Sequence, residues 1–126
     1  MSVFTLHSLY IMEITNKLKK IKIKPLSINE AYRGRRFKTK SLEVYKESLK
    51  YLLPKMSVTE GKLSVTYVFG VSSKGSDGDN LIKAFQDCVA EQYGFNDNKI
   101  YEWYVKKTDV EKGEEFVEFD IKAYSG

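Results

Sequence analysis

The chain has 126 residues, of which 42% are hydrophobic and 30% are charged, so it is long and apolar enough to fold as one domain. No apolar stretch approaches the roughly 18 residues that span a bilayer, and the first residues lack a basic region and a cleavage site of a signal peptide. We therefore expect no membrane partner. One cysteine, Cys88, and one histidine exclude an internal disulfide and a zinc finger, and the cysteine usage is typical of a cytoplasmic protein.

Charge is divided unevenly along the chain. The net charge is +4, but residues 17–62 carry fourteen Lys or Arg against four Asp or Glu, whereas residues 76–126 carry six against twelve. A basic half favours a polyanionic partner such as nucleic acid. An acidic half would repel the same partner unless its carboxylates hold cations. The composition alone also fits an ordinary solvated surface.

Hydrophobic periodicity predicts the elements of the first half. Residues 1–18 have no clear period and are treated as an N-terminal extension of a domain over residues 19–126. Alternating Lys and Ile predict a strand over residues 19–24, and Pro25 ends it. Residues 25–38 are expected to form a loop.

A helix is predicted over residues 41–53 from its apolar spacing, with Thr39 or Ser41 as the N-cap. Residues 62–71 alternate and predict a half-buried strand, with Ser64 and Thr66 on its polar face.

The second half predicts a helix over residues 79–93, with Asp77 or Asp79 as the N-cap and Gly94 at the position after its end. Two further strands are predicted over residues 100–108 and 114–122, joined by a hairpin-like turn at Glu111-Lys112-Gly113. The order β-α-β-α-β-β favours an α+β fold (an α/β two-layer sandwich) in which a small mixed sheet is packed by two helices.

Two short acidic segments are the candidates for chemistry. Asp77 and Asp79 flank Gly78, which lets the backbone bend tightly, and Lys83 follows one helical turn later. Asp97 lies in a second segment after the same helix. Three converging carboxylates would suit Mg²⁺ or Mn²⁺, which prefer oxygen ligands, and a nearby basic surface suggests a phosphodiester substrate. Lys83 could then neutralise charge that develops on the phosphate.

Geometry restricts this hypothesis. A helix of 15 residues separates its ends by roughly 22 Å, so Asp97 meets Asp79 only if the chain runs back along the helix or if a partner chain completes the site. Simpler interpretations also exist. Asp77 and Asp79 fit a helix cap, Lys83 fits an ion pair with Asp79 four residues earlier, and Asp97 between two asparagines fits a turn.

At these residues the sequence resembles the RusA family of Holliday junction resolvases, which are small phage and prophage endodeoxyribonucleases. The first motif is Asp77-Gly78-Asp79-Asn80-Leu81-Ile82-Lys83, and the second is Gly94-Phe95-Asn96-Asp97-Asn98-Lys99-Ile100. The third is a loop that precedes both, Pro25-Leu26-Ser27-Ile28-Asn29-Glu30-Ala31-Tyr32-Arg33. Asn96 departs from the family, which often has an acid there. The three motifs occur in the family's order between about residues 19 and 122.

The resemblance implies a homodimer that cleaves four-way DNA junctions with Mg²⁺. Asp77, Asp79 and Asp97 match the family's metal-binding positions, and Lys83 matches its basic catalytic position. Two paired nicks in a junction of approximate two-fold symmetry require two sites on one symmetric particle. The implied setting is the cytoplasm of a bacterium, with the protein encoded by the host or by a phage.

The basic loop is the candidate DNA-binding segment, because its cations would hold phosphates without reading sequence. The candidate DNA-binding residues are Asn29, Tyr32, Arg33, Arg35, Arg36, Lys38 and Lys40. Two alternatives remain open: a non-catalytic nucleic-acid-binding module, and a metal nuclease specific for another branched DNA.

Overall fold

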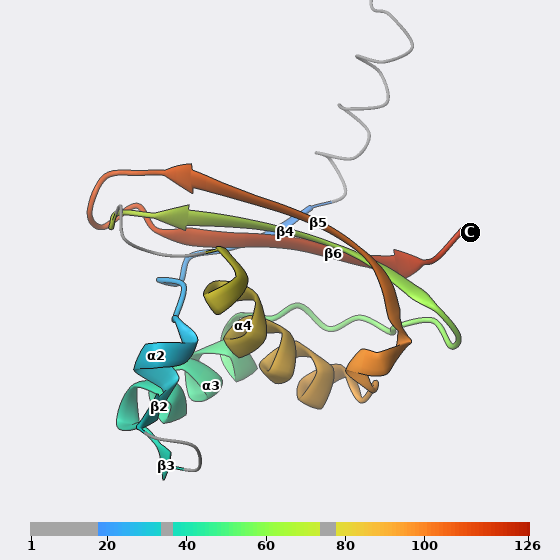
Figure 1. Ribbon diagram of the computed structural model, residues 1–126, viewed down its shortest axis with the longest axis horizontal. Coiled ribbons are helices and arrows are strands. Elements are labelled where there is room, and N and C mark those ends of the chain that lie inside the picture. Colours follow the sequence, from blue (N-terminus) through green and yellow to red (C-terminus); the bar gives the residue numbers. More distant parts are fainter. Residues whose placement is uncertain (1–17, 34–36, 74–77) are drawn as a thin grey trace, which may run out of the picture.

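The computed structural model describes residues 18–33, 37–73 and 78–126. These residues form a sheet covered on one face by helices, which is a two-layer α+β architecture (Figure 1). The predicted fold class is therefore confirmed. The predicted N-terminal extension, residues 1–18, lies almost entirely outside the described residues.

The sheet has four strands in the order β1-β6-β4-β5, with β4 and β5 parallel and the other neighbours antiparallel. The strands are β1 (Lys19–Ile21), β4 (Leu63–Val71), β5 (Ile100–Asp109) and β6 (Phe116–Ala123). The first strand is shorter than predicted, because Ile23 N–H bonds to Ile21 C=O at 3.0 Å and turns the chain away from the sheet.

The two long helices are α3 (Lys40–Leu52) and α4 (Gly78–Tyr93), close to the ranges predicted. Thr39 caps α3, since its hydroxyl accepts a hydrogen bond from Leu42 N–H at 3.3 Å. Gly94 ends α4 with φ +73, a left-handed conformation that favours glycine, and its N–H bonds to Ala90 C=O at 2.9 Å. Both predictions are confirmed.

The segment 25–38, expected to be a loop, contains regular structure. It holds a short helix, α2 (Ile28–Ala31), and a two-stranded ribbon of β2 (Tyr32–Arg33) and β3 (Phe37–Lys38). Ser27 caps α2 by accepting a hydrogen bond from Glu30 N–H at 3.2 Å, and its hydroxyl donates to the Glu30 carboxylate at 3.1 Å. This Ser-x-x-Glu capping box was present in the sequence and marks a helix start.

The parallel pairing of β4 and β5 requires a crossover, and α4 provides it. The helix begins beyond the carboxyl end of β4 and returns to the amino end of β5, where the short 3-10 helix η1 (Asp97–Lys99) leads into the strand (Figure 1). The first acidic segment therefore lies beyond the carboxyl end of β4. The second lies before the amino end of β5, at the opposite end of the sheet.

An aromatic cluster forms the core between the sheet and α4. Phe85 of α4 makes edge-to-face contacts with Tyr67 and Phe69 of β4 and with Phe119 of β6, at centroid distances of 5.4 to 6.2 Å. All four side chains are fully buried. The cluster fixes the register of α4 on the sheet.

Two sequence predictions about the sheet are wrong. Ser64 is buried rather than on a half-exposed face, because β4 is a central strand and Ser64 donates a hydrogen bond to Glu102 at 2.8 Å. The turn at Glu111 exists, with Glu114 N–H bonded to Glu111 C=O at 2.9 Å. It does not close a hairpin, since β4 lies between β5 and β6. Within the described ranges, no helix has the length and apolar character of a membrane span.

Candidate functional site

The first acidic segment leads into α4. Asp79 is the second residue of the helix, and Lys83 follows one turn later. Asp77 lies outside the described residues, as does the side chain of Asp79, so the prediction that one of them caps the helix also falls there. Lys83 is exposed, with 55% of its side chain accessible.

The second acidic segment turns back toward α4. Gly94 and Phe95 N–H groups both bond to Ala90 C=O, at 2.9 and 3.0 Å, which reverses the chain at the helix end. The side chain of Asn96 then caps η1 by accepting a hydrogen bond from Asn98 N–H at 3.0 Å. Asp97 is the first residue of η1 and is exposed.

Lys83 pairs with Asp87, and the negative charge of Asp97 has a smaller effect on it. The pKa of Lys83 is raised chiefly by the hydrogen bond from its Nζ to Asp87 Oδ1, at 2.9 Å, and the negative charges of Asp87 and Asp97 raise it further. The chain reversal after Gly94 thus brings Asp97 within electrostatic reach of Lys83. The sequence alone could not provide this relationship, because it depends on the path of three residues after the helix.

Asp87 is a member of this site that the sequence interpretation missed. Lys83 was expected to pair, if with any acid, with Asp79 four residues earlier. The described partner is Asp87, four residues later. The same i,i+4 spacing was visible in the sequence in both directions.

A buried polar network lies beside these charges. Gln86 of α4 is buried, and its Oε1 accepts hydrogen bonds from Tyr67 Oη at 3.0 Å and from Trp103 Nε1 at 2.9 Å. Burial raises the pKa of Tyr67, and the negative charge of Asp97 adds to the effect. The network therefore joins β4, α4 and β5 next to Asp97.

The basic segment packs against the same helix. α2 contacts both α3 and α4, and Tyr32 is half-buried and contributes to raising the pKa of Lys83. Asn29, Lys38 and Lys40 are exposed.

Three arginines make up the rest of the predicted DNA-binding set. The backbone of Arg33 lies in β2. Its side chain, together with Arg35 and Arg36, lies outside the described residues.

The predicted metal ligands are only partly described. Among the residues whose side chains the structure describes, no three His, Cys, Asp or Glu gather closely enough to hold a metal ion. Asp97 alone of the predicted trio belongs to that set. Its carboxylate is the donor type that Mg²⁺ prefers, and it follows the C-terminal end of α4, whereas Asp79 lies at the start of that helix.

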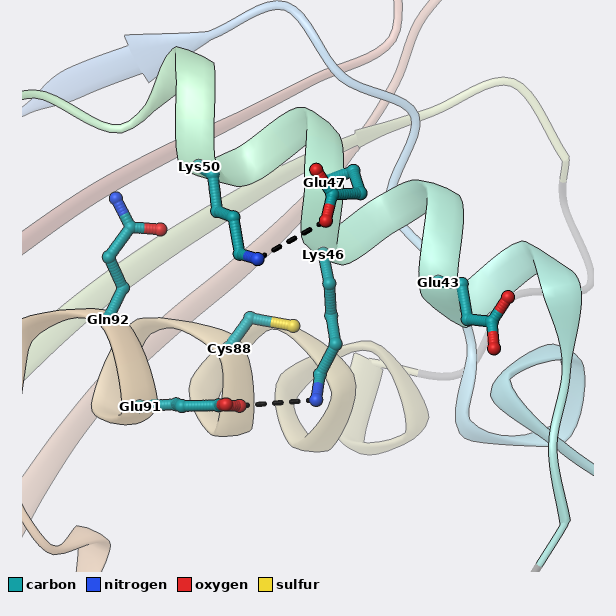
Figure 2. A pocket seen from close by; sticks show the side chains of 7 residues that line it. All are labelled: Glu43, Lys46, Glu47, Lys50, Cys88, Glu91 and Gln92. Atoms are coloured by element: carbon teal, nitrogen blue, oxygen red, sulfur yellow. Dashed lines mark hydrogen bonds and ion pairs between the residues drawn. The ribbon is translucent and has the colours of Figure 1, made fainter.

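A surface pocket of about 550 Å³ lies between α3 and α4 (Figure 2). Four of its charged side chains form two pairs: Lys46 with Glu91 at 3.1 Å across the helices, and Lys50 with Glu47 at 3.2 Å along α3. Cys88 lies at its base, where burial raises the thiol pKa to about 11. A protonated thiol is a poor nucleophile, so this pocket is not a candidate for cysteine chemistry.

Comparison with protein-family models found no match, and no curated protein matches the chain.

Proposed function

We propose that the protein is a homodimeric, Mg²⁺-dependent endodeoxyribonuclease that resolves four-way DNA junctions by paired nicks. The observation that carries the proposal is the placement of Asp79 and Lys83 in the first two turns of α4, with the negative charge of Asp97 making a smaller contribution to the raised pKa of Lys83. This contribution relates the second acidic segment to the helix that begins with the first one. The resemblance of the three motifs to the RusA family supports the same function.

The proposed roles follow from charge and position. Asp79 and Lys83 lie four residues apart near the start of α4, a spacing that places two positions on the same side of a helix. Asp77, Asp79 and Asp97 would hold Mg²⁺ or Mn²⁺. When bound, such an ion polarises a phosphoryl oxygen and lowers the pKa of a bound water. Lys83 is protonated at neutral pH and is held in place by Asp87, and it would neutralise charge on the scissile phosphate.

The basic segment supports DNA as the substrate. Lys38 and Lys40 are exposed beside α2, which packs on α4. With Arg33, Arg35 and Arg36 they would bind phosphates, and Asn29 and Tyr32 complete the proposed contact set. Phosphate contacts position a duplex without reading its sequence, which suits an enzyme selective for DNA structure. We place this activity in the bacterial cytoplasm, with the gene carried by the host or a phage.

Cleavage of matched DNA substrates tests the proposal. The wild-type protein is incubated with a four-way junction, a flap, single-stranded DNA and a linear duplex, each with Mg²⁺, Mn²⁺ or EDTA. We expect symmetric paired nicks in the junction with either metal and none with EDTA. Asp79→Asn and Asp97→Asn should each lower the cleavage rate at least about 100-fold and retain junction binding. Glu60→Gln removes an exposed carboxylate elsewhere and should cleave as the wild type does.

Each other outcome contradicts a defined part of the proposal. Junction binding without cleavage by the folded wild-type protein would indicate a non-catalytic binding module. Cleavage of the flap or the single strand in preference to the junction would indicate a metal nuclease of another specificity. Full activity of Asp97→Asn would exclude the proposed role of the second acidic segment.

A further inference from the structure

The outer edge of β5 is an unusual surface for an edge strand. β5 ends the sheet, and no strand within the described ranges pairs with its outer side. It is ten residues long and mostly exposed. Four of its side chains are large, hydrophobic and exposed: Tyr101 (54%), Trp103 (45%), Tyr104 (54%) and Val105 (39%). Long exposed edges of this kind are templates for pairing with another strand.

We infer that the outer edge of β5 binds a second copy of the chain, as an antiparallel β5–β5 pair centred on Tyr104. The inference rests on the proposed function in one respect: it specifies the interface of the dimer that paired nicking requires. The physical argument for it is independent of metal and DNA, since it depends only on the order of side chains along the strand.

Two-fold symmetry restricts the possible registers. An antiparallel pair of identical strands has its two-fold axis perpendicular to the sheet, so the axis must pass midway between one residue and its own copy on the partner strand. A bulge at Tyr101 interrupts the pairing of β5 with β4, so the regular part of the strand begins at Glu102. The register can therefore be compared over Glu102 and the residues that follow.

Among the registers that pair five or more residues of β5 with the partner strand, only the one centred on Tyr104 places opposite charges against each other. It sets Glu102 opposite Lys106 of the partner subunit, twice by symmetry, and Trp103 opposite Val105 of the partner subunit. Opposite charges and aromatic–β-branched pairs both stabilise facing positions of antiparallel strands. A centre on Val105 sets Glu102 opposite a threonine, and a centre on Lys106 sets two lysines against each other.

The strand is also held in shape for such a contact. Trp103 Nε1 donates to Gln86 at 2.9 Å, and Ser64 Oγ donates to Glu102 Oε1 at 2.8 Å. Both side chains that would meet the partner are thus positioned before association, which lowers the entropic cost of binding. Lysines on an edge often prevent aggregation, and here Lys106 has a complementary acid at the facing position.

The geometry of the pair has a consequence for function. The axis is perpendicular to the sheet, so the two sheets join into one and both helical layers lie on the same side. The two copies of α4, with Lys83 near its start, would then face the same way. A DNA junction with approximate two-fold symmetry could contact both copies of the site at once.

Charge reversal at the facing positions tests the interface by sedimentation of the full chain without DNA or metal. Glu102→Lys and Lys106→Glu each set like charges opposite one another twice, and each should raise the dimer dissociation constant about tenfold or more. The double variant should restore dimerisation. An equimolar mixture of the two single variants should form heterodimers, because each then supplies the charge that the other lacks.

Matched controls separate the interface from folding. Lys112→Glu makes the same charge change as Lys106→Glu in an exposed turn and should dimerise as the wild type does. Ser64→Ala removes the hydrogen bond that positions Glu102 but keeps its charge, so it should raise the dissociation constant less than Glu102→Lys does. In a Cys88→Ala background, Tyr104→Cys should form a disulfide dimer on oxidation, and Val105→Cys should not.

Three results would overturn the inference. The first is a wild-type protein that is monomeric at high micromolar concentration. A monomer whose β5 amides are protected from hydrogen exchange by residues 1–17 is the same negative result. The second is a dimer that both charge reversals leave unchanged. The third is a mixture of single variants that forms no heterodimer. Asp79→Asn should abolish cleavage and leave the dimer intact, so a failure of the proposed nuclease activity is distinguishable from a failure of the interface.

Discussion

Lys83 Nζ lies 2.9 Å from Asp87 Oδ1, one turn along the exposed side of α4. The side chains are 55% and 34% accessible, so solvent screens the pair and its contribution to stability is about 0.5 kcal/mol or less. Its main effect is on Lys83 itself. The carboxylate fixes the ammonium in place and raises its pKa above the ordinary value.

We expect Asp87→Asn to lower the pKa of Lys83 toward its ordinary value, because an amide supplies no negative charge. Below the ordinary lysine pKa both proteins carry the same charge, so the free energy of unfolding near pH 7 should change by less than about 0.5 kcal/mol. NMR titration of the lysine side chains measures the pKa, and thermal melts measure the stability.

Glu47→Gln is the matched control for this change, because it removes a comparable exposed partner from Lys50 on α3. It should leave the titration of Lys83 unchanged. An unaltered Lys83 titration in Asp87→Asn would show that the ion pair is not populated in solution.

Gly70 is predicted to tolerate no side chain. It lies in β4, and a Cβ built there would lie 2.3 Å from Phe116 Cε1 of the neighbouring strand β6. Lys20 Nζ lies over the same ring at 4.5 Å from its centroid, so a shift of the ring would also disturb this contact. Gly70→Ala should lower the free energy of unfolding by about 1–3 kcal/mol, as measured by urea denaturation.

The partner substitution isolates the steric cause. Phe116→Leu removes the ring that meets the new Cβ, so Gly70→Ala should cost less in the Phe116→Leu background than alone. Equal costs in the two backgrounds would mean that the loss of stability comes from the strand backbone and not from the aromatic contact.

Local signals predicted most of the elements. The apolar spacing of α3 and α4 and the caps at Thr39 and Gly94 depend only on neighbouring residues, so the sequence was sufficient for them. The order of strands in the sheet depends on pairing between distant segments. The sequence therefore suggested a hairpin between β5 and β6 that the insertion of β4 excludes.

The candidate site likewise combines relationships that the sequence predicts with others that depend on the fold. Asp79 and Lys83 are related by helical spacing, which a sequence provides directly. The approach of Asp97 to Lys83 depends on the chain reversal after Gly94. Gln86 was hidden because a glutamine on a helix has no pattern that distinguishes a buried acceptor from a solvated side chain.

Gln86→Leu should destabilise the protein through its neighbours. The buried hydroxyl of Tyr67 donates to Gln86 Oε1, as does the indole of Trp103, and leucine would leave both donors without that acceptor. We expect a loss of about 1–3 kcal/mol in the free energy of unfolding. Trp103 is the only tryptophan, so a changed fluorescence spectrum of the folded protein would report its altered environment.

A second substitution tests whether the unpaired hydroxyl is the cause. Tyr67→Phe removes the donor in β4, so combining it with Gln86→Leu should cost less than the sum of the two single variants. Additive losses, with an unchanged tryptophan spectrum, would contradict the network.

Stability is expected to fall above pH 9, and Cys88 begins the decline. Burial raises its pKa from 9.0 to about 11. Between those values the unfolded chain releases the thiol proton and the folded chain retains it. The unfolded state is then favoured progressively, by roughly 2–3 kcal/mol once pH 11 is reached. Burial also raises the pKa of Tyr45 and Tyr67 above their ordinary value of 10.0, so they add to the loss at higher pH.

Cys88→Ala separates the contribution of the thiol from that of the tyrosines. The variant should be less stable at pH 7, because it removes buried volume, but its stability should change little between pH 8.5 and 9.5, where the wild type begins to lose stability. Urea denaturation at closely spaced pH values measures both curves. The thiol of the folded wild type should also react slowly with a disulfide reagent at pH 8. Parallel curves for the two proteins, or rapid modification at pH 8, would show that the thiol of Cys88 is more accessible to solvent than its position between α3 and α4 implies.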